Sequence, residues 1–482
     1  LLAQSGRKVV VLEAGEALAE ADYGHDEGEG FERMFLKAGL LASEDVGIAV
    51  IAGRVLGGGT TVNWMTCFRP SGRLLSQWAE ASGVPGLTGI GLQRSLDEVE
   101  RRLNVSREEG ALNAHNERLV RGAKALGWHY AFQPRNAKGC GDCGMCTFGC
   151  QWGGKQSTPR TYLQDTWDAG AVIVARASVG RVLFNNGQAV GVEAAVGSMG
   201  ALPGRDEGSH RLTVRAPLVV VAAGAVESPA LLLRSGLRHR ALGRNLYLHP
   251  ATVVSGVYDE DVPAWTGPLQ TAYSDQFADL DGRGYGVKFE STPIYAGLAA
   301  TGMPWLGGAE FKREMMDLRH TGTLLVLCRD RNTGRVTIDR QGNPHIYYRL
   351  GRQESKHILY ALKEGTRLLL AAEAREVHTL HTRRASILRE ERDDPAAWSR
   401  YTRQIDRLGA APNDLMLFSA HQMGTCRMSA SPSQGVVDGA GAVHGVRGLY
   451  VADASVFPLS SGVNPMITVM GLAHWIGFRL AR

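Results

Sequence analysis

Four cysteines fall within eleven residues of this chain and have side chains that bind metals. They are Cys140, Cys143, Cys146 and Cys150, and glycines lie between them. The spacing Cys-x2-Cys-x2-Cys-x3-Cys is that of the first cluster-binding run of a bacterial ferredoxin, without the proline that follows it there. Glycine allows such a loop to curl and to direct N–H groups at sulfur. The pattern predicts a [4Fe–4S] site.

Two other interpretations of this loop remain open. Zinc also binds thiolates, although structural zinc sites usually divide their ligands into two well-separated pairs. The second alternative is a reduced or disulfide-linked structural loop. The other cysteines, Cys67, Cys328 and Cys426, are scattered, and this argues against an evenly spaced disulfide framework.

A histidine and an asparagine near the C-terminus suit the oxidation of an alcohol. His421 lies in the sequence HQMGTC, and Asn464 lies in GVNP. Removing the hydroxyl proton requires a base, and imidazole suits this role because its ordinary pKa is near neutral. An isolated histidine is more often structural, and we expect His249 and His474 to be of that kind.

The elements around Asn464 indicate a ligand-binding unit. Residues 449–451 form a short apolar strand that runs into Asp453, and a Ser-Gly-rich turn at 460–462 leads to a helix that opens with Asn464 and Pro465. An acid at the end of a strand can bind a ribose or ribityl hydroxyl. A helix start presents free N–H groups to an electron-rich ligand.

The first residues indicate a nucleotide-binding fold. Residues 8–12 are an apolar run that ends at Glu13. In dinucleotide folds such an acid binds the ribose hydroxyls, about 20 residues after a glycine-rich phosphate turn. Glu13 has no room for that turn before it, so we expect the turn to be missing from this sequence and FAD to bind poorly without it.

Five segments together resemble the glucose–methanol–choline (GMC) oxidoreductases, a family of FAD enzymes. They follow the order of the family along nearly the whole chain, and they read GRVLGGGTTVN, VVVAAGAVESPALLLRSG, GRNLYLHP, HQMGTCRM and GLYVADASVFPLSSGVNPMITVM. The stretch CGMCTFGC with KQST, and the block SAHQMGTCRM, are most similar to long-chain fatty alcohol oxidases. Gly59 departs from many relatives, which carry serine there.

The resemblance implies a role for particular residues. His421 would act as the base, and Asn464 would hydrogen-bond the substrate oxygen. The residues implied to bind FAD, beginning at its adenosine end, are Glu13, Val179, Gly57, Gly58, Asn63, Asp453, Pro465 and Met466. N–H donors at the start of the last helix would stabilise the negative charge of a reduced flavin.

The predicted fold class is α/β with two domains. A discontinuous, Rossmann-like FAD-binding domain would take residues 1–70, 149–250 and 419–482. An α+β substrate domain built on an antiparallel sheet would take residues 251–418, and residues 71–148 would form a cover and linker with the cysteine-rich loop. Within the substrate domain, residues 336–348 predict a β-hairpin and residues 356–374 predict a helix.

Composition narrows the function. The chain has 482 residues and a net charge of +5, from 53 basic and 48 acidic side chains, which gives no reason to expect a nucleic-acid partner. No apolar run reaches the roughly 18 residues that a membrane-spanning helix needs. We expect a bacterial protein that is cytoplasmic or peripheral to a membrane, and a signal peptide upstream stays open.

The sequence predicts FAD-dependent oxidation of a primary or secondary alcohol, with a long-chain, hydrophobic alcohol as the substrate. The electron acceptor would be O2 or a redox carrier. The alternatives are a GMC dehydrogenase for sugars, sterols or terpenoid alcohols, and a truncated, non-catalytic fragment that binds no FAD.

Overall fold

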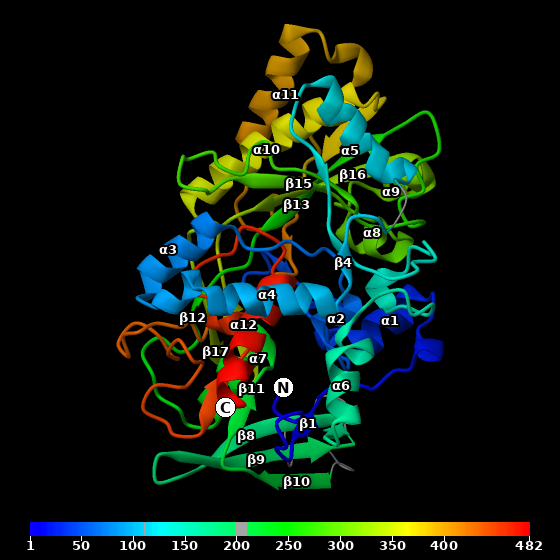
Figure 1. Cartoon of the computed structure of the whole chain (residues 1–482). Helices are drawn as coiled ribbons and strands as arrows, with labels where there is room; N and C mark the ends of the chain where they lie inside the picture. The colour runs from blue at the N-terminus through cyan, green and yellow to red at the C-terminus, as the bar shows by residue number, and fades with distance from the viewer. Residues whose placement is uncertain (110–111, 198–209) are drawn as a thin grey trace.

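The computed structural model describes residues 1–109, 112–197 and 210–482, and it has two halves (Figure 1). Parallel strand pairs and a small antiparallel sheet form the half drawn below in Figure 1, called here the Rossmann-like half. A large sheet forms the half drawn above, called the sheet half. Each half encloses its own cluster of buried apolar side chains, with Val221 and Leu449 in the first and Val254 and Leu324 in the second.

Two parallel strand pairs form the centre of the Rossmann-like half. β1 (Val10–Leu12) pairs with β7 (Val172–Val174), and β11 (Val219–Val221) pairs with β22 (Leu449–Val451). Valine favours such strands because its branched side chain packs well on a pleated surface. Helix α7 (Gly224–Arg234) follows β11 directly.

An antiparallel sheet and two packed helices complete this half. The sheet has the order β10–β9–β8, from β8 (Ala177–Asn185), β9 (Gln188–Val196) and β10 (His210–Arg215). The C-terminal helix α12 (Met466–Leu480) packs on α4 (Ile90–Arg102). The absent side chain of Gly471 permits this approach, because a Cβ there would collide with Leu96.

A ten-stranded sheet, antiparallel except at one pair, forms the sheet half. Its main path runs β2–β3–β21–β13–β16–β15–β14–β5, and β19 and β20 lie beside β13. The strands are β2 (Leu41–Ala42), β3 (Ala49–Val50), β5 (Ala131–Phe132), β13 (Ala251–Val257), β14 (Ala272–Ser274), β15 (Val287–Ser291), β16 (Thr321–Cys328), β19 (Glu376–Thr379), β20 (Ser386–Leu388) and β21 (Phe418–Ser419). Helices α5 (Ala114–Ala125) and α10 (Arg352–Ala371) pack against it.

Shorter elements connect and cover the two halves. The helices are α1 (Glu27–Met34), α2 (Gly59–Val62), α3 (Gly72–Ser82), α6 (Tyr162–Asp168), α8 (Ala296–Gly302), α9 (Gly308–Asp317) and α11 (Pro395–Leu408). A two-stranded sheet joins β4 (Val105–Ser106) to β6 (Arg135–Asn136), and a three-stranded sheet has β17 (Gly334–Ile338) between β12 (Arg244–Leu246) and β18 (Pro344–Tyr347).

The predicted fold class is confirmed, and several predicted elements are present with shifted bounds. The hairpin at 336–348 forms as β17 and β18, although it lies outside the large sheet. The helix predicted at 356–374 is α10, four residues earlier at its start. Pro465 caps α12 from outside and does not lie in its first turn. Val10, the first residue of β1, is 44% exposed, so the apolar run at the start of the chain is only partly buried. Among the described residues, no helix combines the length and apolarity needed to cross a membrane.

Candidate active site

His421 lies against a second histidine, His249, which ends the segment before β13. The two Nδ1 atoms are 3.2 Å apart, and the ring planes are nearly perpendicular at 86°. The backbone N–H of Gly462 donates to Nε2 of His249 at 2.9 Å. His249 therefore connects His421 to the turn that precedes Asn464, and it places the two residues predicted to be catalytic in the same part of the molecule.

These hydrogen bonds determine the tautomer of each ring. Nε2 of His249 accepts from a backbone N–H, so neutral His249 carries its proton on Nδ1. That N–H donates to Nδ1 of His421, and neutral His421 then carries its proton on Nε2. Burial lowers the pKa of His421 to about 4 and lowers the pKa of His249 well below its usual value. Both rings are therefore neutral at pH 7, and Nε2 of His421, the nitrogen that does not face His249, is a hydrogen-bond donor.

A buried carboxylate, Asp330, holds the segments on both sides of His249. It accepts hydrogen bonds from the N–H of Leu248 at 2.7 Å, the hydroxyl of Ser460 at 2.7 Å and the hydroxyl of Tyr348 at 2.9 Å. Burial raises the pKa of Asp330 to about 6. One side chain just after β16 thus positions both the segment that carries His249 and the turn that leads to Asn464.

Asn464 is nearly buried, and its orientation depends on Glu290 in β15. Nδ2 of Asn464 donates to Oε2 of Glu290 at 3.1 Å, and Gln270 donates to the same oxygen at 3.0 Å. Burial raises the pKa of Glu290, which is fully enclosed. Because the amide nitrogen faces the carboxyl group, Oδ1 of Asn464 is left as an acceptor. This oxygen is buried and has no partner among the residues that the structure describes.

The glycine-dense turn before α2 lies beside the start of α12. Nδ2 of Asn63 donates to Sδ of Met466 at 2.8 Å, so two residues predicted to bind the cofactor are in contact. A Cβ built on Gly58 or Gly59 would meet no atom within 4 Å, and Gly58 has φ 50° and ψ −130°, which favours glycine. Gly57 closes this turn, with its carbonyl bound by the hydroxyl of Thr60.

Glu13 and Val179 lie at the adjoining ends of β1 and β8. The carbonyl of Glu13 accepts from the N–H of Ala177, two residues before Val179. Its side chain accepts from the N–H of Gly15 at 2.7 Å, and burial raises the pKa of this carboxyl group. The two residues predicted to contact the adenosine end are therefore neighbours.

Asp453 uses both carboxylate oxygens within the protein. One accepts from the N–H of Gly224 at 2.8 Å and from the hydroxyl of Ser228, and the other accepts from the N–H of Ser455 at 2.8 Å. Asp453 therefore shapes the turn between β11 and α7, which begins at Gly224. Its contact with a ribityl chain stays a prediction.

The residues implied to bind FAD suit such a group. Gly58, Gly59 and Gly224 all border open space, as close approach of a flat ring or a pyrophosphate to the backbone requires. Glu13 and Val179, implied to bind the adenosine end, lie where β1 and β8 adjoin. Asn63 contacts Met466 at the start of α12. Pro465, between Asn464 and Met466, caps the helix whose first N–H groups are free.

Lys155 joins the glycine-dense turn to the cysteine-rich loop. Its side chain is 1% exposed, and Nζ donates to the carbonyl oxygens of Thr61 and Asn63, each at 2.6 Å, and of Cys146 at 2.9 Å. An ammonium group that satisfies three buried carbonyls fixes the segments that carry them.

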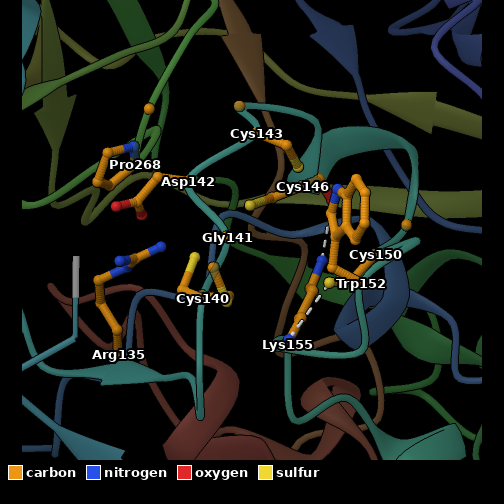
Figure 2. A pocket seen from close by; sticks show the side chains of 14 residues that line it. Arg135, Cys140, Gly141, Asp142, Cys143, Cys146, Cys150, Trp152, Lys155 and Pro268 are labelled. Carbon is orange, nitrogen blue, oxygen red and sulfur yellow. Dashed lines mark hydrogen bonds between the residues drawn. The ribbon is translucent and has the colours of Figure 1, made fainter.

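The four clustered cysteines line one pocket (Figure 2). None of the seven cysteines forms a disulfide, and all lie within the described ranges. In the described part of the chain, no three His, Cys, Asp or Glu side chains are grouped so that they could hold a metal ion. The arrangement gives no support to a metal at this loop, and zinc binding and iron–sulfur binding both stay predictions.

Sequence reasoning missed four residues that organise these sites, and one of them is Asp330, described above. His249 was expected to be only structural, although its place in GRNLYLHP was a signal. Lys155 lies in KQST, next to the cysteines, and its role was not foreseen. Glu290 has no motif around it, since only the pairing of β15 within the sheet brings it to Asn464.

Comparison with known proteins identifies relatives over the whole chain. Residues 31–251 and 330–473 match the N-terminal and C-terminal family models described as GMC oxidoreductase. A long-chain-alcohol oxidase from Arabidopsis thaliana is 32% identical over 100% of this chain and 66% of its own length. The chain thus spans just under two thirds of that relative. An uncharacterized GMC-type oxidoreductase from Mycobacterium tuberculosis is 35% identical over 98% of this chain and 72% of its own.

Solved structures share the fold at low sequence identity. The pyridoxine 4-oxidase of Mesorbium loti aligns with a TM-score of 0.70 and 17% identity over 99% of this chain and 96% of its own. A formate oxidase from Aspergillus oryzae RIB40 aligns with a TM-score of 0.68, also at 17% identity, over 99% of this chain and 94% of its own.

Proposed function

The chain belongs to the GMC oxidoreductase family, and from this premise we propose that it binds FAD and oxidises an alcohol to a carbonyl compound. The observation that carries the proposal is the contact of His249 with both His421 and the turn before Asn464. This contact brings His421 and Asn464 into the same part of the molecule, and both side chains suit the binding of a hydroxyl group.

The two side chains are complementary to an alcohol. Oδ1 of Asn464 is a buried acceptor without a partner in the described structure, and Nε2 of neutral His421 is a donor. A hydroxyl group donates one hydrogen bond and accepts others, so it satisfies both. A carbonyl product cannot donate to Asn464, and this leaves the buried acceptor unsatisfied again, which favours release of the product.

FAD supplies the acceptor for the hydride when it is bound, and Glu13, Asn63 and Met466 are among the residues that would hold it. His421 must take up the hydroxyl proton. It can do so on Nε2 only if its own proton moves to Nδ1, because a neutral imidazole has one N–H. Nδ1 of His421 then becomes the donor to His249, whose proton must lie on Nε2, and the bond from Gly462 is given up. The hydroxyl hydrogen must also turn from Oδ1 of Asn464 to Nε2 of His421, so proton transfer is coupled to this rotation and to a tautomer change in the histidine pair.

We propose a primary or secondary alcohol with a long apolar chain as the substrate. The similarity to a long-chain-alcohol oxidase over the whole chain supports this class. The acceptor that reoxidises the protein is O2 or a redox carrier.

Anaerobic flavin reduction tests the proposal. The full chain, loaded with FAD, is mixed with a dodecanol-type alcohol, a sugar, a sterol and a terpenoid alcohol, and bleaching of the flavin absorbance is recorded. We expect the long-chain alcohol to react fastest. If a sugar, sterol or terpenoid alcohol reduces the flavin faster, that compound class replaces the long-chain alcohols as the proposed substrate. If no alcohol reduces the FAD-loaded protein, the proposed function is wrong. Admission of O2 with assay of peroxide then distinguishes oxidase from dehydrogenase.

A further inference from the structure

The pocket lined by Cys140, Cys143, Cys146 and Cys150, called here the cysteine pocket, has features that the proposed alcohol chemistry does not use. All four thiols come from one loop, and all four border the same space (Figure 2). The fourth thiol therefore needs no second site, unlike the corresponding cysteine of a two-cluster ferredoxin.

The loop is shaped and held by the surrounding protein. Gly139, Gly144 and Gly149 have φ between 66° and 92°, and Asp142 has φ 50°, so the backbone repeatedly takes the left-handed conformation. A side chain on Gly144 would collide with the carbonyl of Trp265, and the hydroxyl of Tyr295 donates to the Gly144 carbonyl at 2.7 Å. Such a loop is preorganised and does not merely cover the surface.

Two buried cations line the same pocket. The Arg135 side chain is 1% exposed, and its Nε and Nη2 have no hydrogen-bond partner among the described residues, although Nη1 donates to the carbonyl of Glu109 at 3.0 Å. Lys155 is equally buried. No ion pair is formed by either cation within the described ranges, and Asp142 is the single carboxylate in the lining. A buried, unpaired guanidinium is costly unless an anion accompanies it.

We propose that the cysteine pocket binds a [4Fe–4S] cluster through its four thiolates. Each thiol loses its proton to solvent as its sulfur bonds an iron atom. The resulting thiolate-ligated cluster is anionic, and Arg135 and Lys155 provide the compensating positive charge.

The position of the pocket gives such a cluster a place beside the glycine-dense turn before α2. Lys155 borders the pocket and also binds the carbonyls of Thr61 and Asn63 in the glycine-dense turn. Trp152 lines the pocket and is 66% exposed. The cluster would therefore lie between a cofactor-binding turn and the protein surface.

Metal and sulfide analysis of the full chain tests the proposal. Protein prepared anaerobically and reconstituted with equal amounts of ferrous and ferric iron and with sulfide should hold about four iron atoms and four sulfides per chain, and dithionite reduction should produce a paramagnetic signal. Cys143→Ser and Cys140→Ser should each lose most of the iron. The matched control is Cys426→Ser, a buried cysteine outside the pocket, which should keep it. Melting curves of all three variants report whether each one is folded.

Three results would overturn the proposal. Wild-type protein that stays below one iron atom per chain after reconstitution would show that no cluster forms. One zinc per chain with no sulfide would show a mononuclear structural site. If the folded cysteine variants keep all their iron, the iron is bound at another site. Iron and sulfide are measured independently of flavin content, so failure here leaves the alcohol oxidation standing.

Discussion

The alcohol site and the cysteine pocket are assembled in opposite ways. The alcohol site draws His249, Glu290, Asp330, His421 and Asn464 from five separate segments. The cysteine pocket takes its four thiols from one loop. In the first, long-range hydrogen bonds set the orientation of each group, whereas in the second, local backbone turns do so. A dispersed site is therefore sensitive to any one of its supports, and a local site should tolerate changes elsewhere.

The largest expected effect separates the two sites directly. His421→Ala should lower alcohol-dependent flavin reduction by about 10²–10⁴-fold, the usual contribution of a positioned general base. FAD content and iron content should not change. Stopped-flow bleaching with a long-chain alcohol measures the rate. His474→Ala serves as the control, because His474 contacts Ser95 on α4 and no member of the alcohol site in the described structure. A parental rate in His421→Ala would refute the assignment.

A smaller effect should follow from removing the support of Asn464. Glu290→Leu frees Nδ2 of Asn464, and the amide can then rotate away from the orientation that presents Oδ1. We expect a fall in kcat of about tenfold, near the lower end of the 1.5–3 kcal/mol that a hydrogen bond to a charged group contributes. Glu290→Gln keeps an acceptor in place and should restore most of the rate. A rate that falls equally in both variants would show that Glu290 acts through its charge and not by orienting Asn464.

These two predictions show how far sequence reasoning reaches. The histidine and asparagine could be predicted because each lies in a distinctive motif, and the cysteine pocket could be predicted because its residues are adjacent in the chain. Glu290 and Asp330 could not, since strand pairing and turn packing bring them to the site from segments without motifs. The parallel strands were predictable from runs of valine and leucine. Their exposure was not, because it depends on which neighbours cover them.

A change in stability should test the connection between the two sites. Lys155→Met leaves the carbonyls of Thr61, Asn63 and Cys146 without their donor, and each unsatisfied buried group costs about 1–3 kcal/mol. We expect a lower melting temperature together with partial loss of both FAD and iron. Lys138→Met, an exposed neighbour of the same loop, is the control. Loss of iron alone, with normal FAD content, would contradict a shared support.

Lowering the pH should gradually reduce the stability of the folded chain, because several of its histidines are buried. Burial lowers the pKa of His421 to about 4 and of His115 to about 3, and it lowers the pKa of His249 as well. Between these values and the unfolded pKa near 6.5, the unfolded chain binds more protons, so stability falls as pH falls, by about 1.4 kcal/mol per unit for each group.

Melting temperatures from pH 7 to pH 5 check this sign. Asp330 acts in the opposite direction, because its pKa of about 6 lies above the unfolded value and its proton uptake favours the folded chain on acidification. Burial also raises the pKa of other acids, Glu13 and Glu290 among them. The histidines with a lowered pKa are more numerous, and their unfolded pKa near 6.5 lies inside this pH range, so we expect a net loss of stability towards pH 5. A melting temperature that rises over this range would mean that the acids dominate.

The four hydrogen-bond partners of Asp330 have a practical consequence for engineering. This carboxylate holds four segments together. Its hydrogen bonds connect the segment before β13, the end of the hairpin strand β18 and the turn before α12 to the end of β16. A library for altered substrate range should therefore leave position 330 unchanged, because a replacement there removes the acceptor that all of these segments share.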